Sequence, residues 1–449
     1  MSLTPQVYRS LRIAWQEGIP AHIMLAVIDY FLVPYALFLG LSPTQVGWVV
    51  AVPHLMSAMM QLIAVRSLQW FRSSRVYFLV MTTLFQSMML FSIALIVFFR
   101  TDTHFYALIL CVSIFRILLG LSNTIWGSLV SDYLPPEKRG HYMGWRAQIT
   151  GLSGMLGVIF SGVFLFYVKK ISEVYAFFLL FLFAALCRAI SSHLMAKFHD
   201  VKHEWVPGTH FSFFDFIRQA KKSNFVKFVL YSAGIMFATH VAAPYYSVYL
   251  LEELKLNYLL YMFIHFSGIV AGLISYPIWG KHADITGNAR LLKLVGFLIS
   301  FVPVCWLFSK NVVYLMFIEF YAGFVWGAFA LCTVTFIFDA VTPAKRARCL
   351  GYFNLISGLG IFLGTVLGGQ ALEIFPKLLG SSFYSIFLLS GILRFSVFAF
   401  LGRAFQEIRH VQPVTQGQLL ASVCGVRPLV GLARGWNVFP ELEQKPKVE

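Results

Sequence analysis

Long runs of hydrophobic residues, separated by short polar segments, recur along the whole of this chain. Clear examples are 76–99, 174–190 and 383–400. A helix needs about 20 consecutive apolar residues to cross the hydrocarbon core of a bilayer. The pattern predicts twelve such helices, near residues 19–40, 45–65, 76–99, 105–128, 147–168, 174–196, 226–250, 258–280, 291–309, 312–336, 350–375 and 382–402. We therefore expect an all-α integral membrane protein.

The polar segment that follows the fourth predicted helix occurs again 207 residues later. Asp132, Pro136 and Lys138-Arg139 match Asp339, Pro343 and Lys345-Arg346, and four glycines after them match in the same register: Gly144, Gly151, Gly157 and Gly162 with Gly351, Gly358, Gly364 and Gly369. A match of this kind indicates an internal duplication. It predicts two six-helix bundles, 1–196 and 226–402, related by a pseudo-twofold axis. A polar linker, 197–225, joins them, and a polar tail, 403–449, follows.

Composition and charge support this prediction. Hydrophobic residues make up 59% and charged residues 12% of the chain, whereas a soluble domain carries about 25% charged residues. The net charge of +16 arises mostly from one side of the predicted topology, and the loops of the other side carry only Arg100, Lys169, Lys170, Lys255, Lys310 and Lys377. This is the positive-inside bias of a membrane protein. It predicts cytoplasmic termini, in the inner (plasma) membrane of a bacterium, and argues against nucleic-acid binding.

Nothing in the spacing of reactive residues indicates an enzyme. The six cysteines show no paired or metal-binding spacing, and no phosphate-binding Gly-x-x-x-x-Gly-Lys-Ser/Thr loop is present. We expect neither cofactor nor metal, and a monomer whose partners are membrane lipids and a small solute. Residues 1–18 are predicted to lie at the membrane surface as an amphipathic segment. The tail, 403–449, shows no legible function.

Three local motifs accompany the twelve predicted helices and the repeated polar segment. The loop after helix eight reads Gly280-Lys-His-Ala-Asp284-Ile-Thr-Gly287-Asn-Ala-Arg290, and helix four carries Arg116-x-x-x-Gly120 near its midpoint. Helix one carries Asp29. Over about residues 15–405 the chain resembles the major facilitator superfamily of transporters. It departs from the family at 65–75, where Gln69 stands at the position of the loop aspartate, and in helix five, which lacks the Gly-Pro pair of the drug/proton antiporters.

The resemblance implies a secondary transporter that moves a small solute by rocking two halves about a central site. Asp29 and Arg116 lie at similar depth, and a charge in the hydrocarbon core needs a partner or water. The two residues form either a proton-coupling and solute-binding couple or a structural ion pair. Protons are the expected coupling ion, as in a symporter, and Arg116 alone favours an anionic organic solute. Glu319 is the acid of the second half, with no basic residue on its own helix.

Further residues are expected around the central site: Asn123, Trp126, His240, Tyr245, Tyr246 and Trp326. His54 and His265 are interpreted as structural, and Arg188 and Arg394 are expected to reach the headgroups with their long stems.

The loop acids Asp132, Asp284 and Asp339 end helices, where the negative pole disfavours them. They are expected to pair with nearby cations, among them Arg139, Arg290 and Arg346. The resemblance implies that such pairs latch the inner face in one state, and the alternative is a fixed clasp without a gating role.

A second class of function stays open beside transport. The decayed loop around Gln69 and the aromatic content of 17% are compatible with a non-transporting scaffold or assembly factor that holds a pigment, a lipid or a partner protein.

Overall fold

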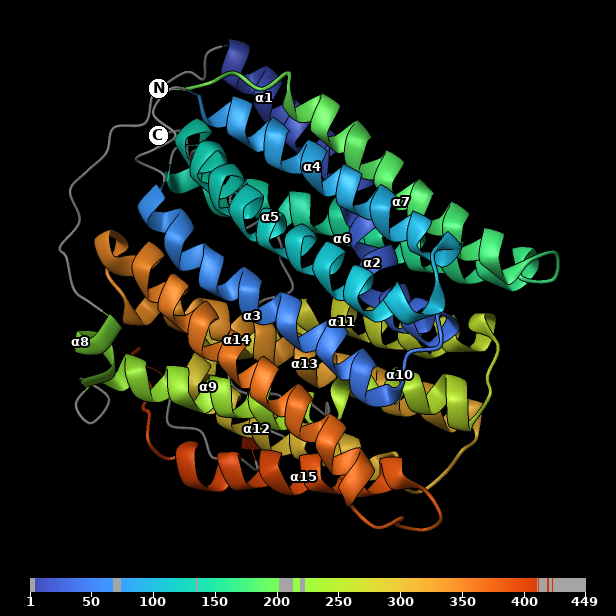
Figure 1. The fold of residues 1–449 in the computed structure, drawn as a ribbon. Helices are drawn as coiled ribbons and strands as arrows, with labels where there is room; N and C mark the ends of the chain where they lie inside the picture. The colour runs from blue at the N-terminus through green and yellow to red at the C-terminus, as the bar shows by residue number, and fades with distance from the viewer. Residues whose placement is uncertain are drawn as a thin grey trace, which may run out of the picture.

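The computed structural model describes residues 5–67, 74–134, 136–201, 213–218, 223–409, 411, 418–419 and 422. The described residues are nearly all helical (Figure 1), with an isolated bridge between Leu378 and Ser381. The helices of the first half are α1 Pro5–Gln16, α2 Gly18–Phe38, α3 Pro43–Ser67, α4 Arg75–Leu95, α5 His104–Tyr133, α6 Pro136–Val168 and α7 Glu173–Met195. After α8 Phe213–Arg218 follow α9 Asn224–His240, α10 Ala243–Val248, α11 Tyr258–Thr286, α12 Asn288–Cys305, α13 Val312–Ala340, α14 Pro343–Ile374 and α15 Ser382–Leu401.

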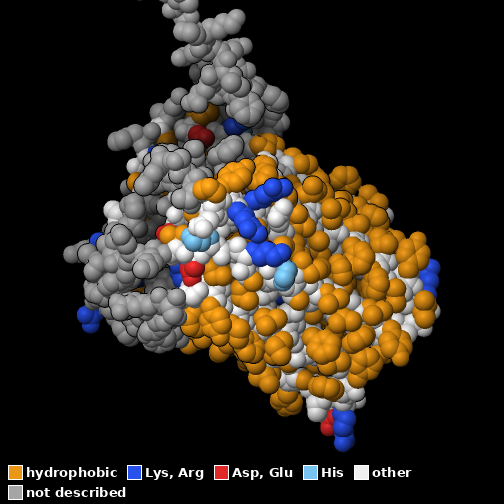
Figure 2. All heavy atoms as spheres, turned by 90° about the horizontal axis from the view of Figure 1, so that it is seen from above, with side chains coloured by type: hydrophobic (Ala, Val, Ile, Leu, Met, Phe, Trp, Pro, Cys, Tyr) orange, Lys and Arg blue, Asp and Glu red, His pale blue; other side chains and the backbone are white. Residues whose placement is uncertain are grey.

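The prediction of an all-α membrane protein is confirmed. Among the described residues, 11 helices are long and apolar enough to cross a membrane, and α3, with 25 residues, stands where the second spanning helix was predicted. Figure 2 shows one face of the molecule covered by hydrophobic side chains with few charges among them. Such a surface is expected of a protein whose solvent is lipid.

The seventh predicted helix differs from its prediction because it is broken. α9 ends at His240, α10 begins at Ala243, and residues Tyr249–Glu253 continue as a π-helix. Pro244 lies in the first turn of α10, where its missing N–H costs nothing. The break turns the chain within a membrane-spanning segment, and neighbouring helices satisfy the freed backbone groups in such places.

The long helices run side by side. The most extensive contacts between the halves are those of α3 with α14 and of α6 with α11, and α10 also contacts α2 and α3. In Figure 1, α7 ends and α9 begins at the same end of the bundle, near α8. We call this the linker end, and the other the opposite end. Glycines allow close helix contacts, since side chains at Gly323 or Gly364 would collide with the backbone of Gly268 or Phe237. In lipid, where no hydrophobic force drives helices together, such close packing holds them.

The start of the tail has a structural role, which the sequence alone did not show. Phe405 is fully buried among Phe228, Tyr231 and Phe336. Leu419 is also buried in the same hydrophobic cluster. The start of the tail is therefore part of the packed second half.

Candidate functional site

Asp29 on α2 and Arg116 on α5 form an ion pair near the middle of their helices. Arg116 Nη2 lies 2.5 Å from Asp29 Oδ1, and the two side chains are 13% and 45% exposed, respectively. The predicted proximity of the two residues is thus present, although proximity alone does not decide between coupling and a structural role. The Asp29 carboxylate is therefore not enclosed by protein, whereas a purely structural pair can be fully enclosed.

Glu319 on α13 is the acid of the second half, and it packs against Gly268 on α11. Within the described part of the chain, no hydrogen bond or ion pair involves its carboxyl group. Tyr30, Tyr246 and Tyr261 lie within electrostatic range of it. An acid without a partner in a membrane-spanning helix favours protonation or a ligand.

The sequence interpretation missed a group of residues that joins the halves beside these acids. Tyr261 on α11 donates a hydrogen bond to the Tyr30 carbonyl at 2.8 Å. His265, one turn further along α11, lies with its ring centroid 4.5 Å from that of Tyr261 and 5.6 Å from that of Tyr30. Its Nε2 is buried without a hydrogen-bond partner among the described residues, so the structural reading of His265 finds no support. One feature of the sequence could have indicated this position: His265 lies one helical turn before Gly268-x-x-x-Gly272, a spacing typical of close helix contacts.

Tyr245 and Tyr246, neighbours on α10, have different surroundings. The Tyr245 hydroxyl donates to the Thr365 carbonyl at 2.9 Å and the side chain is fully buried. The expectation that Tyr245 faces the solute is therefore wrong for this conformation, because its hydroxyl holds α10 to α14. The Tyr246 ring packs at a tilt against Trp306 and Phe387 with centroids 4.6 Å apart, and its hydroxyl lies beside the Arg394 guanidinium. Tyr246 stays a candidate contact for the solute.

The remaining predicted solute contacts are dispersed. Asn123 is exposed on α5, and the Trp126 ring lies 4.1 Å below the Arg146 guanidinium in a cation–π contact. His240 shares a hydrogen bond with the Met236 carbonyl at the end of α9, and Trp326 packs edge-on against Phe329. The structure does not bring these four side chains together as one site.

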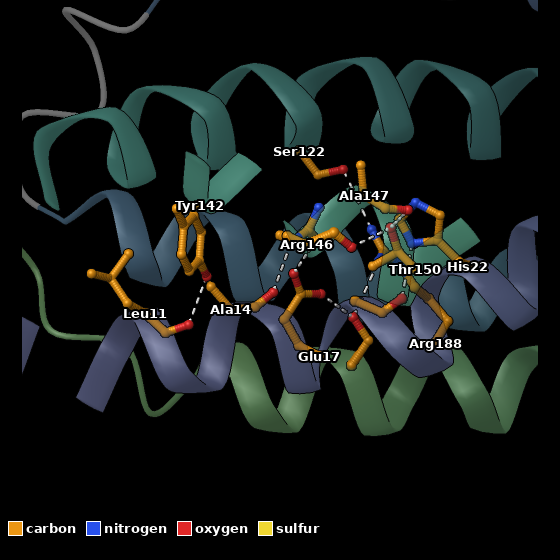
Figure 3. Close-up of polar contacts among 12 residues, drawn as sticks. Leu11, Ala14, Glu17, His22, Ser122, Tyr142, Arg146, Ala147, Thr150 and Arg188 are labelled. Carbon is orange, nitrogen blue, oxygen red and sulfur yellow. Dashed lines mark hydrogen bonds and ion pairs between the residues drawn. The ribbon is translucent and has the colours of Figure 1, made fainter. Parts of the chain in front are cut away.

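A buried charge cluster near the linker end was not anticipated (Figure 3). Arg146 Nη2 lies 3.0 Å from Glu17 Oε1, and the Ser191 hydroxyl donates to Glu17 Oε2 at 3.0 Å. Arg188 donates to Gln86 at 2.8 Å and is 3% exposed. Its expected contact with the headgroups is therefore wrong, since internal acceptors satisfy the guanidinium. Arg394, expected to behave likewise, is 1% exposed and donates to Ser390 and to the Ile299 carbonyl.

The same cluster docks the N-terminal segment against the bundle. The Tyr142 hydroxyl donates to the Leu11 carbonyl at 2.6 Å, and Arg146 Nε donates to the Ala14 carbonyl at 2.9 Å (Figure 3). Leu11, Ile13 and Ala14 are buried. The expectation of a surface-lying segment is thus corrected, because α1 packs through these residues on the first half.

The loop acids have partners near the linker end. Asp132 pairs with Arg75 at 2.7 Å. Asp339 pairs with Arg409 of the tail at 2.7 Å and accepts from Asn288 at 2.8 Å, where the sequence had suggested Arg346. Asp284 lies 3.7 Å from Arg409. The side chains of Arg139 and Arg346 lie outside the described residues, and Arg290 is engaged in a polar or electrostatic interaction.

At the opposite end, hydrogen bonds join the two halves directly. The Tyr258 hydroxyl on α11 donates to Glu173 Oε1 on α7 at 2.7 Å. The Thr44 hydroxyl on α3 donates to Glu373 Oε1 on α14 at 2.5 Å. Both hydrogen bonds therefore cross from one half to the other at this end.

A family model adds the decisive comparison, because the Major Facilitator Superfamily model matches residues 19–365 and 231–436. The chain belongs to the Major Facilitator Superfamily. This membership confirms the predicted fold and makes a membrane transporter, not an enzyme, the class of function.

Individual relatives are distant. "Multidrug resistance protein 3" of Bacillus subtilis (strain 168) is 34% identical over 104 residues, which are 23% of this chain and 20% of that protein. "Vacuolar basic amino acid transporter 1" of Saccharomyces cerevisiae is 29% identical over 97 residues, 22% and 17% of the two chains. These matches span about a fifth of each relative.

Solved structures show the same fold. A bacterial homologue of the human lysosomal transporter Spinster, in an inward-facing and unoccupied conformation, superposes with a TM-score of 0.63 at 16% identity over 90% of this chain and 98% of that one. The nucleoside transporter NupG gives 0.65 at 13% identity, over 88% and 99% of the chains.

Proposed function

We propose that this transporter carries a small solute by proton-coupled alternating access, with Asp29 and Arg116 as the coupling pair. The observation that carries the proposal is the ion pair itself, because its acid is 45% exposed in mid-helix. An exposed acid can exchange a proton with water, whereas a sealed pair cannot.

The pair suggests how a proton and an anionic solute bind together. While Asp29 is ionised, it occupies Arg116. Protonation of Asp29 removes that charge, and the guanidinium is then free to grip an anionic group of the solute, which Arg does well because of its planar fork of donors. The proton and the anion together leave the net charge of the site unchanged. The expected reaction is therefore symport of an anionic organic solute with protons.

Variants of the pair test this mechanism in proteoliposomes, after a thermal-shift screen of metabolites has supplied a ligand that stabilises the folded protein. Asp29→Asn should abolish proton-driven accumulation and spare counterflow, which requires binding and rocking but no net proton movement. Arg116→Lys should transport poorly. A structural pair predicts something else: each single neutralisation lowers the folded yield, and the Asp29→Asn, Arg116→Gln double variant recovers both yield and gradient-driven uptake. Absence of any uptake would favour the scaffold function.

A second solute class is favoured by Glu319. Its carboxyl group has no hydrogen bond or ion pair within the described residues, and it packs against Gly268 of α11. A solute with a cationic group would satisfy this acid, and a zwitterion would satisfy Arg116 as well. Phenylalanine, phenethylamine and 3-phenylpropanoate share one skeleton and differ in charged groups. Phenethylamine carries only the cationic group, 3-phenylpropanoate only the anionic group, and phenylalanine both. If 3-phenylpropanoate binds most tightly of the three, and Glu319→Gln does not change its affinity, solutes with a cationic group are excluded.

The proposed orientation places the linker end in the cytoplasm of a bacterial cell. The positive-inside bias supports it. Single cysteines at Lys197 and Lys345, both exposed near the linker end, should react only with reagents that cross the membrane. Single cysteines at Ile171 and Phe308, 87% and 74% exposed near the opposite end, should react from outside. The reverse pattern would contradict the orientation.

A further inference from the structure

The opposite end carries a compact polar cluster that bridges the two halves. Glu173, in the first turn of α7, accepts a hydrogen bond from the Tyr258 hydroxyl at 2.7 Å and pairs with Lys169 at 2.9 Å. The Lys169 ammonium also lies 4.9 Å from the centroid of the Tyr258 ring. One aromatic side chain of the second half thus meets both an anion and a cation of the first half.

A second bridge lies between α3 and α14. Thr44 donates its hydroxyl hydrogen to Glu373 Oε1 at 2.5 Å, and its side chain also approaches the Gly369 carbonyl at 3.5 Å. A side chain at Gly369 would meet Thr44 and Tyr245. The small residue lets α14 come close enough for Thr44 to reach Glu373.

Only interactions that differ between two conformations shift the equilibrium between them. Contacts within one half move with that half and survive a rigid-body rocking motion. The contacts of Glu173 and Glu373 cross from one half to the other, so they are lost when the opposite end opens.

We infer that Glu173 and Glu373 are the gate carboxylates of this transporter, which position the two halves in the conformation whose opposite end is closed. Tyr258 and Thr44 are their partners in the other half. The two bridges are chemically alike, since a hydroxyl donates to a carboxylate in each. They act together with the Tyr261 to Tyr30 hydrogen bond, which lies closer to Asp29 and ties the closed end to the central site.

The chain offers a matched control at the same end. Glu253 accepts from the Ser381 hydroxyl at 2.6 Å and lies 3.4 Å from Lys310. It is a carboxylate with a hydroxyl donor and a lysine, like Glu173, but all three residues belong to the second half. Its neutralisation removes similar chemistry without removing a bridge between the halves.

The test measures the distance between spin labels at Ile171 and Phe308, in a background without the six native cysteines. Glu173→Gln and Tyr258→Phe should each raise the ratio of long to short distances by about two- to tenfold, as expected for one lost hydrogen bond. The double variant should add little to either single one, since both remove the same bond. Thr44→Val and Glu373→Gln should act in the same direction and more weakly, because Glu373 is exposed. Glu253→Gln should leave the ratio unchanged.

Two outcomes would overturn the inference: an unchanged ratio in both Glu173→Gln and Tyr258→Phe, or an equal shift in Glu253→Gln. Tyr258→Phe keeps the aromatic ring and its packing, so the protein should fold and the distance ratio remains measurable. The inference rests on alternating access but not on proton coupling or on the solute. A failed distance test therefore leaves the Asp29 experiments standing, and failed proton coupling in Asp29→Asn leaves the gate standing.

Discussion

The two halves hold their repeated loop acid with cations from different places. In the first half, Asp132 pairs with Arg75, at the start of α4, and Arg75 also donates to the Val201 carbonyl. In the second half, Asp339 pairs with Arg409, which lies in the tail and outside the repeat. Duplication supplied the acid twice, and the acid needs a cation because it lies at the end of a helix. Which cation meets it is a matter of packing.

The tail segment 405–409 packs against the second half and places Arg409 beside Asp339. Arg409 Nη2 donates a hydrogen bond to Asp339 Oδ1 at 2.8 Å, and Arg409 Nε lies 2.7 Å from Asp339 Oδ2. Hydrogen bonding to Asp339 raises the pKa of the Arg409 guanidinium. Glu407 accepts from the Ala289 N–H at 2.7 Å and occupies the space beside Gly287, whose φ of +87° favours glycine. Asn224 and Gln406 exchange two hydrogen bonds. All these contacts lie within the second half and the tail. They therefore fix the tail to the second half, and they do not favour one conformation of the transporter over another.

The two halves also differ in their buried charged residues. The first half buries Glu17 with Arg146 and Arg188, and the second half buries Arg394 with neutral acceptors only. Arg188 and Arg394 are separated by 206 residues, close to the repeat of 207, yet only the former has an acid nearby. The first half therefore depends on a charge balance that the second half lacks.

The largest expected effect follows from removal of the Glu17 charge. Glu17→Gln leaves two buried guanidinium groups without an anion, which should cost about 3–5 kcal/mol of stability. Folded yield and thermal unfolding in detergent measure the loss. Asp102→Asn is the control, because its pair with Arg100 is exposed, and it should change neither quantity.

A smaller loss is expected from Arg394→Met in the second half. No buried acid loses its partner. The substitution leaves the Ile299 carbonyl without its donor, whereas the Ser390 hydroxyl keeps its hydrogen bond to the Ala238 carbonyl at 2.6 Å. We expect about 1–3 kcal/mol in the same thermal assay. A loss equal to that of Glu17→Gln would contradict the contrast between the halves.

Arg409→Ala should destabilise the second half by about 1–2 kcal/mol, because Asp339 loses its ion pair and its charge-assisted hydrogen bond with Arg409 but keeps the hydrogen bond from Asn288. Arg409→Lys should recover only part of this stability, since an ammonium cannot bind bidentately. The distance between labels at Ile171 and Phe308 should stay that of the parent protein. A changed distance would show that the contact between Arg409 and Asp339 affects the conformational equilibrium, contrary to this prediction.

The smallest effect is expected for Asp284→Asn. The side chain is 81% exposed and lies 3.7 Å from Arg409, and such surface pairs contribute about 0–1 kcal/mol. Thermal stability should be nearly unchanged. The distance between labels at Ile171 and Phe308 then distinguishes the two hypotheses for this loop. An unchanged distance distribution indicates a fixed clasp. A shift in either direction indicates a latch that forms in only one conformation.

The sequence by itself determined the membrane-spanning helices and the family fold. Hydrophobic runs of about 20 residues have few stable alternatives in a bilayer, and the 207-residue repeat marks the duplication. The meeting of Asp29 and Arg116 could also be expected, because each charge needs a partner at the same depth.

The tertiary structure alone decided which polar side chains meet. Glu17 and Arg188 are separated by more than 170 positions, and Arg409 lies 70 positions after Asp339. No periodicity in a sequence encodes such pairs, because they depend on the rotation and depth of separate helices. The same holds for the consecutive residues Tyr245 and Tyr246, because a step of one residue directs the first hydroxyl to the Thr365 carbonyl and the second to the Arg394 guanidinium.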